Sequence, residues 1–135
     1  MKNCVVCNIS FDGRKIAKYC GKTCSSKAEK KRKQIRTKLF VYAYMMESGC
    51  VDCGEKDLVV LDFDHVRGEK KHSLSYLIHK ARSLDTIKSE IAKCDVRCAN
   101  CHRRKTARDF GWHVSIADEL KYSPPKQKKK HTNKK

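Results

Sequence analysis

Closely spaced cysteine pairs set the framework of this chain. It has nine cysteines in 135 residues, and eight of them fall into four pairs. Thiolates at such short spacings bind Zn²⁺ in a closed tetrahedral site, which stabilises a fold and leaves no open position for chemistry. The sequence therefore predicts two structural zinc sites. One uses Cys4, Cys7, Cys20 and Cys24, and the other uses Cys50, Cys53, Cys98 and Cys101.

Thiols bind zinc where they stay reduced, so the expected compartment matters. No apolar run near Met1 resembles a signal peptide, and none elsewhere is long enough to span a membrane. Without export the thiols stay reduced, which favours metal binding over disulfides. We therefore expect a cytoplasmic protein with no membrane partner. A disulfide-rich secreted domain is the alternative.

The charge balance indicates a polyanionic partner. The chain has 32 Lys and Arg against 15 Asp and Glu, a formal net charge of +17. Each cation at a phosphate releases a condensed counterion, so a large, clustered excess favours nucleic acid. A solvated, solubilising surface is the other interpretation. A membrane surface fits less well, because no basic stretch has a wide apolar face with aromatic residues.

The chain divides into four regions by composition. We expect a zinc finger over 1–26, a basic linker helix over 27–48, a central module over 49–112 and a basic tail over 113–135. In the first region Asp12-Gly13 is a two-residue hairpin signal, which predicts a short strand on each side. This region is similar to short treble-clef or ribbon-type zinc fingers.

The linker is expected to form one long helix. From Thr23 to about Glu47 no Gly or Pro interrupts a run of good helix formers. Apolar residues recur along it with helical spacing, and we expect this stripe to pack into the core. The stripe consists of Ile35, Leu39, Tyr42 and Met46.

The first half of this helix is strongly basic. Between 27 and 38 seven residues are Lys or Arg and one is Glu. Such cations repel one another unless an anion lies alongside, so we expect this half to face phosphates, with a merely solvated face as the alternative. The residues expected to contact nucleic acid here are Lys31, Arg32, Lys33 and Arg36.

The central module is expected to combine a strand with a facing helix. The stretch 58–64 is rich in β-branched residues and predicts a strand. A helix should follow the module's second cysteine pair, with His102 and Lys105 on one face. Because zinc ties this helix against the strand, His102 should approach Asp64. Alternation sends Asp64 and His65 to opposite faces, so both reach one phosphate only if the strand twists or ends there.

The combined motif of this module has a known counterpart. A C-x-x-C pair, then LDFDHV, then CANCHRRKT resembles the HNH nuclease family, whose ββα-metal fold carries its active site on a strand and a facing helix. The resemblance covers about residues 50–106. It implies that Asp64 and His102 bind a catalytic divalent ion and that His65 is the general base.

The residue types suit the chemistry that the resemblance implies. A carboxylate and an imidazole leave a hard ion such as Mg²⁺ or Mn²⁺ with open positions for water and a phosphate oxygen. A histidine at neutral pH can accept a proton from water. The expected reaction is metal-dependent hydrolysis of phosphodiester bonds in double-stranded DNA. Arg103, Arg104 and Lys105 would hold the flanking phosphates.

One position departs from the family pattern. The family's middle Asn, which holds the loop that orients the base, is absent from the corresponding stretch Ala92-Lys93-Cys94-Asp95. Cys94, the ninth cysteine, is expected to fill that place as a small buried residue. A zinc-dependent nucleic-acid-binding protein with impaired catalysis is therefore the alternative function.

The insert between the two halves of the module is expected to be helical. Two short helices are predicted, at about 73–81 and 84–93, with Ser83 as an N-cap. The sequence as a whole thus predicts an α+β fold. It would consist of a Cys4 finger, a long basic helix and a small zinc-stapled ββα module.

Overall fold

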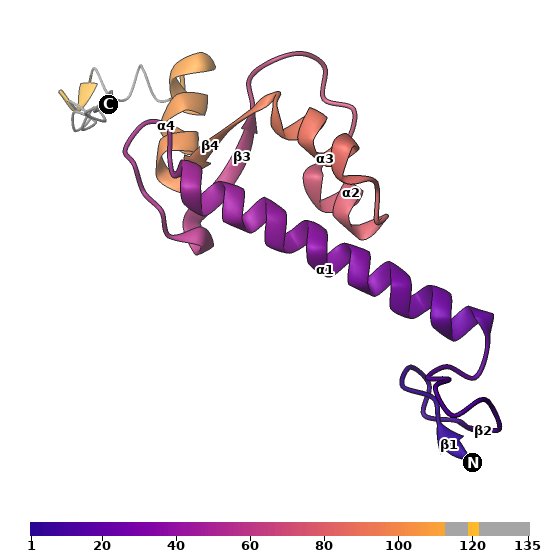
Figure 1. Ribbon diagram of the computed structural model, residues 1–135. Coiled ribbons are helices and arrows are strands. Elements are labelled where there is room, and N and C mark those ends of the chain that lie inside the picture. Colours follow the sequence, from indigo (N-terminus) through magenta and orange to yellow (C-terminus); the bar gives the residue numbers. More distant parts are fainter. Residues whose placement is uncertain (113–118, 122–135) are drawn as a thin grey trace, which may run out of the picture.

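The computed structural model describes residues 1–112 and 119–121. In these residues the fold is α+β, with four α-helices and two small two-stranded sheets. The long helix α1 (Lys22–Ser48) runs from the N-terminal strands to the larger part of the fold (Figure 1). The predicted basic tail, 113–135, lies outside the described residues except at 119–121.

The N-terminal finger is built on a short hairpin. β1 (Lys2–Asn3) pairs antiparallel with β2 (Ser10–Phe11). The chain reverses between them at Asn8, whose φ is 59° and whose backbone N–H donates to the carbonyl of Cys4. The prediction of a hairpin around Asp12-Gly13 is therefore wrong. The turn comes earlier, because the first cysteine pair itself bends the chain.

Glycines bound the long helix. α1 is 27 residues long and starts directly after Gly21, inside the region expected for the finger. It ends at Gly49, whose φ is +61° and where a Cβ would lie 3.0 Å from the carbonyl oxygen of Glu55. This close approach favours glycine as the stop signal. No helix in the described ranges is both long enough and apolar enough to cross a membrane.

The buried face of α1 differs from the expected one. Its buried residues are Cys24, Thr37, Val41 and Met45. The predicted stripe lies on another side of the helix and is exposed by 48% at Ile35, 66% at Leu39, 43% at Tyr42 and 52% at Met46. The prediction that this stripe packs into the core is therefore wrong. The rest of the module contacts the helix on the Val41 and Met45 side instead.

A β-hairpin forms the centre of the larger part. β3 (Leu61–His65) pairs antiparallel with β4 (Cys94–Cys98), with Leu61 opposite Cys98 and His65 opposite Cys94. α4 (Ala99–Asp109) follows β4 directly and contacts both strands. A strand pair and a helix thus form the expected ββα arrangement. The strand begins later than predicted, because a 3₁₀ turn (Leu58–Val60) precedes it.

The insert between the strands forms two short helices. α2 (Leu74–His79) and α3 (Leu84–Ile91) contact each other, and α2 also contacts α1. The hydroxyl of Ser83 accepts from the backbone N–H of Thr86, which confirms this residue as an N-cap.

One hydrophobic core joins the helices to one face of the hairpin. It includes side chains from α1, β3, β4, α2 and α3. Two of the most buried are Leu77 of α2 and Ile87 of α3. The core also contains the cysteines Cys50, Cys98 and Cys101, so one predicted zinc site lies against it.

Candidate metal and nucleic-acid sites

The four finger cysteines come together as predicted. The sulfur atoms of Cys4, Cys7, Cys20 and Cys24 all lie within 4.8 Å of one another. The Sγ atom of Cys20 is 3.6 Å from the Sγ atom of Cys7 and 3.6 Å from that of Cys24. Bonds of about 2.3 Å to one Zn²⁺ place two tetrahedral sulfurs about 3.8 Å apart. The group therefore fits a structural zinc ion.

The four module cysteines form the second group. Cys50, Cys53, Cys98 and Cys101 also lie within 4.8 Å of one another, and the Sγ atoms of Cys53 and Cys98 are 3.8 Å apart. Gly54, with a φ of 82°, turns the chain after the first pair and donates its N–H to the carbonyl of Cys50. This group also fits a structural zinc ion. An ion here would tie the end of α1 to β4 and α4.

Each group contains thiols of contrasting acidity. In the finger, desolvation raises the pKa of Cys4, but hydrogen bonds from backbone N–H groups outweigh it and lower that pKa to about 6. The neighbouring thiol of Cys7 raises the pKa of Cys20 to about 12. In the module, backbone N–H groups overcome desolvation and lower the pKa of Cys50 to about 7, whereas desolvation raises the pKa of Cys101. Binding a metal at either group therefore displaces protons.

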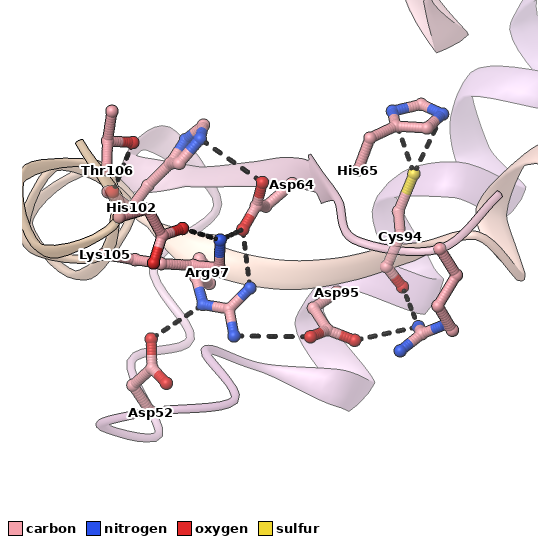
Figure 2. Close-up of polar contacts among 11 residues, drawn as sticks. Asp52, Asp64, His65, Cys94, Asp95, Arg97, His102, Lys105 and Thr106 are labelled. Carbon is pink, nitrogen blue, oxygen red and sulfur yellow. Dashed lines mark hydrogen bonds and ion pairs between the residues drawn. The ribbon is translucent and has the colours of Figure 1, made fainter. Parts of the chain in front are cut away.

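Asp64 and His102 meet between β3 and α4. The Oδ1 atom of Asp64 lies 3.5 Å from the Nε2 atom of His102 (Figure 2). The Asp64 residue is buried, with 8% exposed, and the side chain of His102 is 38% exposed. The carboxylate thus forms the floor of the site, and the imidazole lies at its rim. α4 follows β4 directly and β4 pairs with β3, which explains why a residue distant in sequence approaches Asp64.

Arg97 of β4 holds the other oxygen of Asp64. Its Nη1 atom donates to Oδ2 of Asp64 at 2.6 Å, and its Nε atom donates to Oδ2 of Asp52 at 2.9 Å. Its Nη2 atom is 3.3 Å from Oδ2 of Asp95. Desolvation lowers the pKa of Arg97, but Asp52 and Asp64 outweigh this and raise it. One buried guanidinium therefore connects the turn within the module's first cysteine pair, where Asp52 lies, to the candidate site (Figure 2).

The basic residues of α4 divide between two faces. Lys105 lies on the same face as His102, as predicted, and its Nζ atom is 3.9 Å from Oδ2 of Asp64. Lys105 also pairs with Asp109, which raises the pKa of the amine. Helical periodicity turns Arg103 and Arg104 away from that face, and both are exposed. These two remain available to an external anion.

His65 does not join the Asp64–His102 pair. It is the last residue of β3, and the strand stays paired up to this point, opposite Cys94. Its ring therefore lies on the face opposite Asp64 (Figure 2). There the Nε2 atom of His65 is 2.8 Å from Oε1 of Glu90, and the side chain is 16% exposed.

His65 lines a groove on that second face. The groove has a volume of about 790 Å³ and lies between α1, β3 and α2. Apolar side chains such as Tyr42 and Phe63 line part of it, and Lys38 and Lys70 add positive charge. The imidazole of His65 therefore borders a groove with both apolar and positively charged side chains.

Nothing in the sequence indicated that two further residues, Glu90 and Arg97, belong to this region. Glu90 is 4% exposed, and a hydrogen bond from Lys93 is the main cause that lowers its pKa to about 2, against desolvation. Arg97 is 8% exposed and donates a hydrogen bond to the candidate metal ligand Asp64. A buried charge needs such partners, and burial became visible only with the fold. Cys94 is buried as expected, and desolvation raises the pKa of its thiol to about 11.

The basic half of α1 lies on the surface. The four predicted contact residues Lys31, Arg32, Lys33 and Arg36 are all exposed. Arg32 has an acidic neighbour, Glu29, 3.3 Å away on the same helix. A groove of about 530 Å³ lies along this half, and Lys30 and Lys33 are among its lining residues. The helix therefore presents a long band of positive charge.

Comparison with protein-family models, curated proteins and solved structures finds no match for this chain. Its function therefore has to follow from the geometry and chemistry of its own residues.

Proposed function

We propose that this protein is a metal-dependent endonuclease of the HNH type that hydrolyses phosphodiester bonds in double-stranded DNA. The observation that carries the proposal is the pairing of Asp64 and His102, with Oδ1 and Nε2 3.5 Å apart. Asp64 lies on β3, and His102 lies on the helix that directly follows its partner strand β4 and begins within the second cysteine group. A high positive charge, +17, supports a nucleic acid as the substrate.

The donor atoms of this pair suit a divalent ion. Two ligands with bonds of about 2.1 Å lie about 3.0–4.2 Å apart, depending on the angle at the ion. The observed separation of 3.5 Å falls within that range. With two ligands from the protein, an ion such as Mg²⁺ or Mn²⁺ would stabilise charge on the phosphoryl group and on the departing oxygen.

A phosphate that binds at the free edge of β3 would be close to both Asp64 and His65. In the described part of the chain β3 pairs with β4 alone, so its other edge has no strand beside it. Adjacent Cα atoms are about 3.8 Å apart, and a phosphate at that edge would lie close to both faces of the strand. Asp64 would then hold one side, and His65 would accept the proton of the attacking water on the other.

The remaining cations would bind and orient the duplex. Arg103 and Arg104 are exposed in the middle of α4 and directly follow His102 in sequence. Positioning of this kind lowers the entropic part of the barrier. The basic half of α1 and the zinc finger would extend the contact along the DNA backbone.

A plasmid assay tests this function. The full-length, zinc-loaded protein should convert supercoiled plasmid to nicked circles when Mg²⁺ or Mn²⁺ is added. His65→Ala should lower the rate at least about 100-fold, since a general base contributes that much. Asp64→Asn and His102→Ala should also lower it. His72→Ala is the matched control, because this histidine is exposed and lies near Tyr76, away from Asp64.

A nucleic-acid-binding protein without hydrolysis is the second candidate. It is favoured by the two cations next to Asp64, Arg97 at 2.6 Å and Lys105 at 3.9 Å, because they compete with an added ion. Binding of the duplex without nicking in any divalent ion would support this candidate. Equal nicking by the wild type and by His102→Ala would mean that a contaminating nuclease is present.

A further inference from the structure

We infer that Glu90 is a positioning residue, which holds His65 as the tautomer with the proton on Nε2 and leaves Nδ1 as the proton acceptor. The catalytic meaning of this inference rests on the proposed function, but the tautomer itself does not. No family feature assigns this role, since the expected orienting residue is an Asn. Glu90 lies in α3, on the side of the hairpin away from Asp64.

Glu90 is held firmly from two sides. Its Oε1 atom is 2.8 Å from Nε2 of His65, and its Oε2 atom accepts from Nζ of Lys93 at 2.9 Å. The side chain is 6% exposed. Lys93 is itself fixed, because its Nζ atom also donates to the carbonyl of Glu69 at 3.1 Å. The carboxylate thus has little freedom to leave the imidazole.

The charge of Glu90 decides which ring nitrogen has the proton. The lysine and the histidine keep this carboxyl ionised, with a pKa lowered to about 2. A carboxylate has no proton to donate, so the 2.8 Å contact requires a proton on Nε2 of His65. In a neutral imidazole the lone pair is then on Nδ1.

Cys94 does not need that lone pair as an acceptor for its own proton. Its Sγ atom is 3.4 Å from Nδ1 and 3.6 Å from Nε2 of His65, nearly the same distance from both. A sulfur aligned with one nitrogen in the ring plane would be much farther from the other, so this sulfur lies over the ring face. Its own proton has another acceptor, because Sγ donates to the carbonyl of Glu90 at 3.4 Å.

Lys93 connects this arrangement to the loop after the strand. Its carbonyl accepts from the backbone N–H groups of Val66 and Arg67, both at 3.1 Å. The stretch that lacks the expected Asn therefore still anchors the residues next to His65. Lys93 does so with its backbone, and its side chain fixes Glu90.

Nuclear magnetic resonance of the histidine rings gives a direct test. Long-range ¹H–¹⁵N correlation on the full-length, zinc-loaded protein at pH 8 distinguishes the two tautomers. His65 should have its proton on Nε2 in the wild type and in Glu90→Gln, whose amide oxygen can still accept. In Glu90→Met the signal should shift towards a mixture. A wild type with the proton on Nδ1, or an unchanged pattern in Glu90→Met, would overturn the inference.

Controls separate a local effect from loss of fold. Zinc content and circular dichroism should match among the variants, and Glu47→Gln, on the exposed surface of α1, should leave the His65 pattern unchanged. If Glu90→Met fails to fold, Glu90→Gln and the wild type still decide the tautomer.

Kinetics then connect the tautomer to catalysis. Glu90→Met should lower kcat for nicking about 10–100-fold with KM for DNA nearly unchanged, as expected for the loss of an orienting partner. Glu90→Gln should recover part of that loss. An unchanged kcat in Glu90→Met would overturn the catalytic role. A wild type that does not nick would overturn the proposed function instead, and the resonance data would still decide the tautomer.

Discussion

Arg97 lies outside the HNH-like motif, yet it holds the candidate metal ligand Asp64 in place. It is the counter-charge for three carboxylates, those of Asp52, Asp64 and Asp95. Removing one partner of a buried ion pair leaves the others uncompensated in a poorly hydrated place. The fold and the site therefore depend on the same guanidinium.

Replacing Arg97 should be costly. Arg97→Met keeps much of the side-chain volume but removes the charge, and should lower the free energy of unfolding by about 3 kcal/mol. Urea denaturation of the zinc-loaded protein measures this. Arg103→Met is the matched control on α4, and its cost should stay within about 0.5 kcal/mol because the residue is exposed. Equal costs for both variants would contradict the role given to Arg97.

The motif residues could be predicted from the sequence, whereas their partners could not. Asp64 and His102 are found by their places relative to the cysteine pairs, and the structure brings them together. Glu90 and His65 are 25 residues apart, and Arg97 and Asp64 are 33 apart. Helical and strand periodicities act over a few residues, so neither pairing leaves a pattern in the chain.

The alternation of β3 explains why His65 needed the structure. A strand that ended at Asp64 would free the next residue to turn towards His102. Instead His65 is paired with Cys94, and its ring is directed to the helical side of the hairpin. The partner strand decides where a strand ends. The sequence of one strand alone therefore does not predict which residue is its last.

The face of α1 that packs is set by tertiary contacts and not by its own periodicity. Two sets of residues recur with helical spacing, Ile35 to Met46 on one side and Thr37 to Met45 on another. The first set is the more apolar, yet the second is buried because Val41 and Met45 contact the core. A local pattern cannot choose between two such faces when the partner is unknown.

Substitutions on the two faces should therefore differ in cost. Met45→Ala removes a side chain that is 5% exposed and should destabilise the protein by about 2–3 kcal/mol. Leu39→Ala changes a residue that is 66% exposed and should cost about 0.5 kcal/mol or less. Thermal and urea unfolding of the zinc-loaded variants compare them. A larger cost at Leu39 than at Met45 would contradict the observed orientation of α1.

Two cysteine groups that could each hold a zinc ion lie at the two ends of α1. Metal-free thiols must lose protons to bind, so zinc affinity should rise with pH. The pKa of Cys20 is raised to about 12 and that of Cys24 is also raised, so both are protonated at neutral pH. In the second group the pKa values of Cys53 and Cys101 are raised as well.

Zinc binding should therefore release at least two protons per site. The apparent affinity should rise at least about 100-fold for each pH unit between pH 6 and pH 7.5, since each released proton contributes a factor of ten. Competition with a chromophoric chelator measures this slope. Circular dichroism should show loss of structure as zinc leaves. A slope near zero would mean that the cysteine groups do not bind the ion as thiolates.

α1 runs between the two cysteine groups (Figure 1), and the cations of its first half are exposed. Each cation that contacts a phosphate contributes about 0.9 to the slope of log K against log salt. Diffuse attraction from a net charge of +17 also raises affinity, but it does not depend on any one position. The salt dependence of DNA binding can therefore separate direct contact from general charge.

Neutralising the exposed cations of α1 should change the slope of log K against log salt more than neutralising exposed cations elsewhere in the protein. The test variant changes Lys31, Arg32, Lys33 and Arg36 to Gln. If all four contact phosphates, its slope should fall by about 3.6.

The matched control removes the same charge from exposed positions elsewhere, Lys56, Lys71, Lys80 and Arg82. Its slope should change by less than about 1, since these residues are not expected to touch phosphates. Fluorescence anisotropy on a short duplex without a divalent ion measures binding alone. Equal changes in both variants would show that α1 attracts DNA without contacting it.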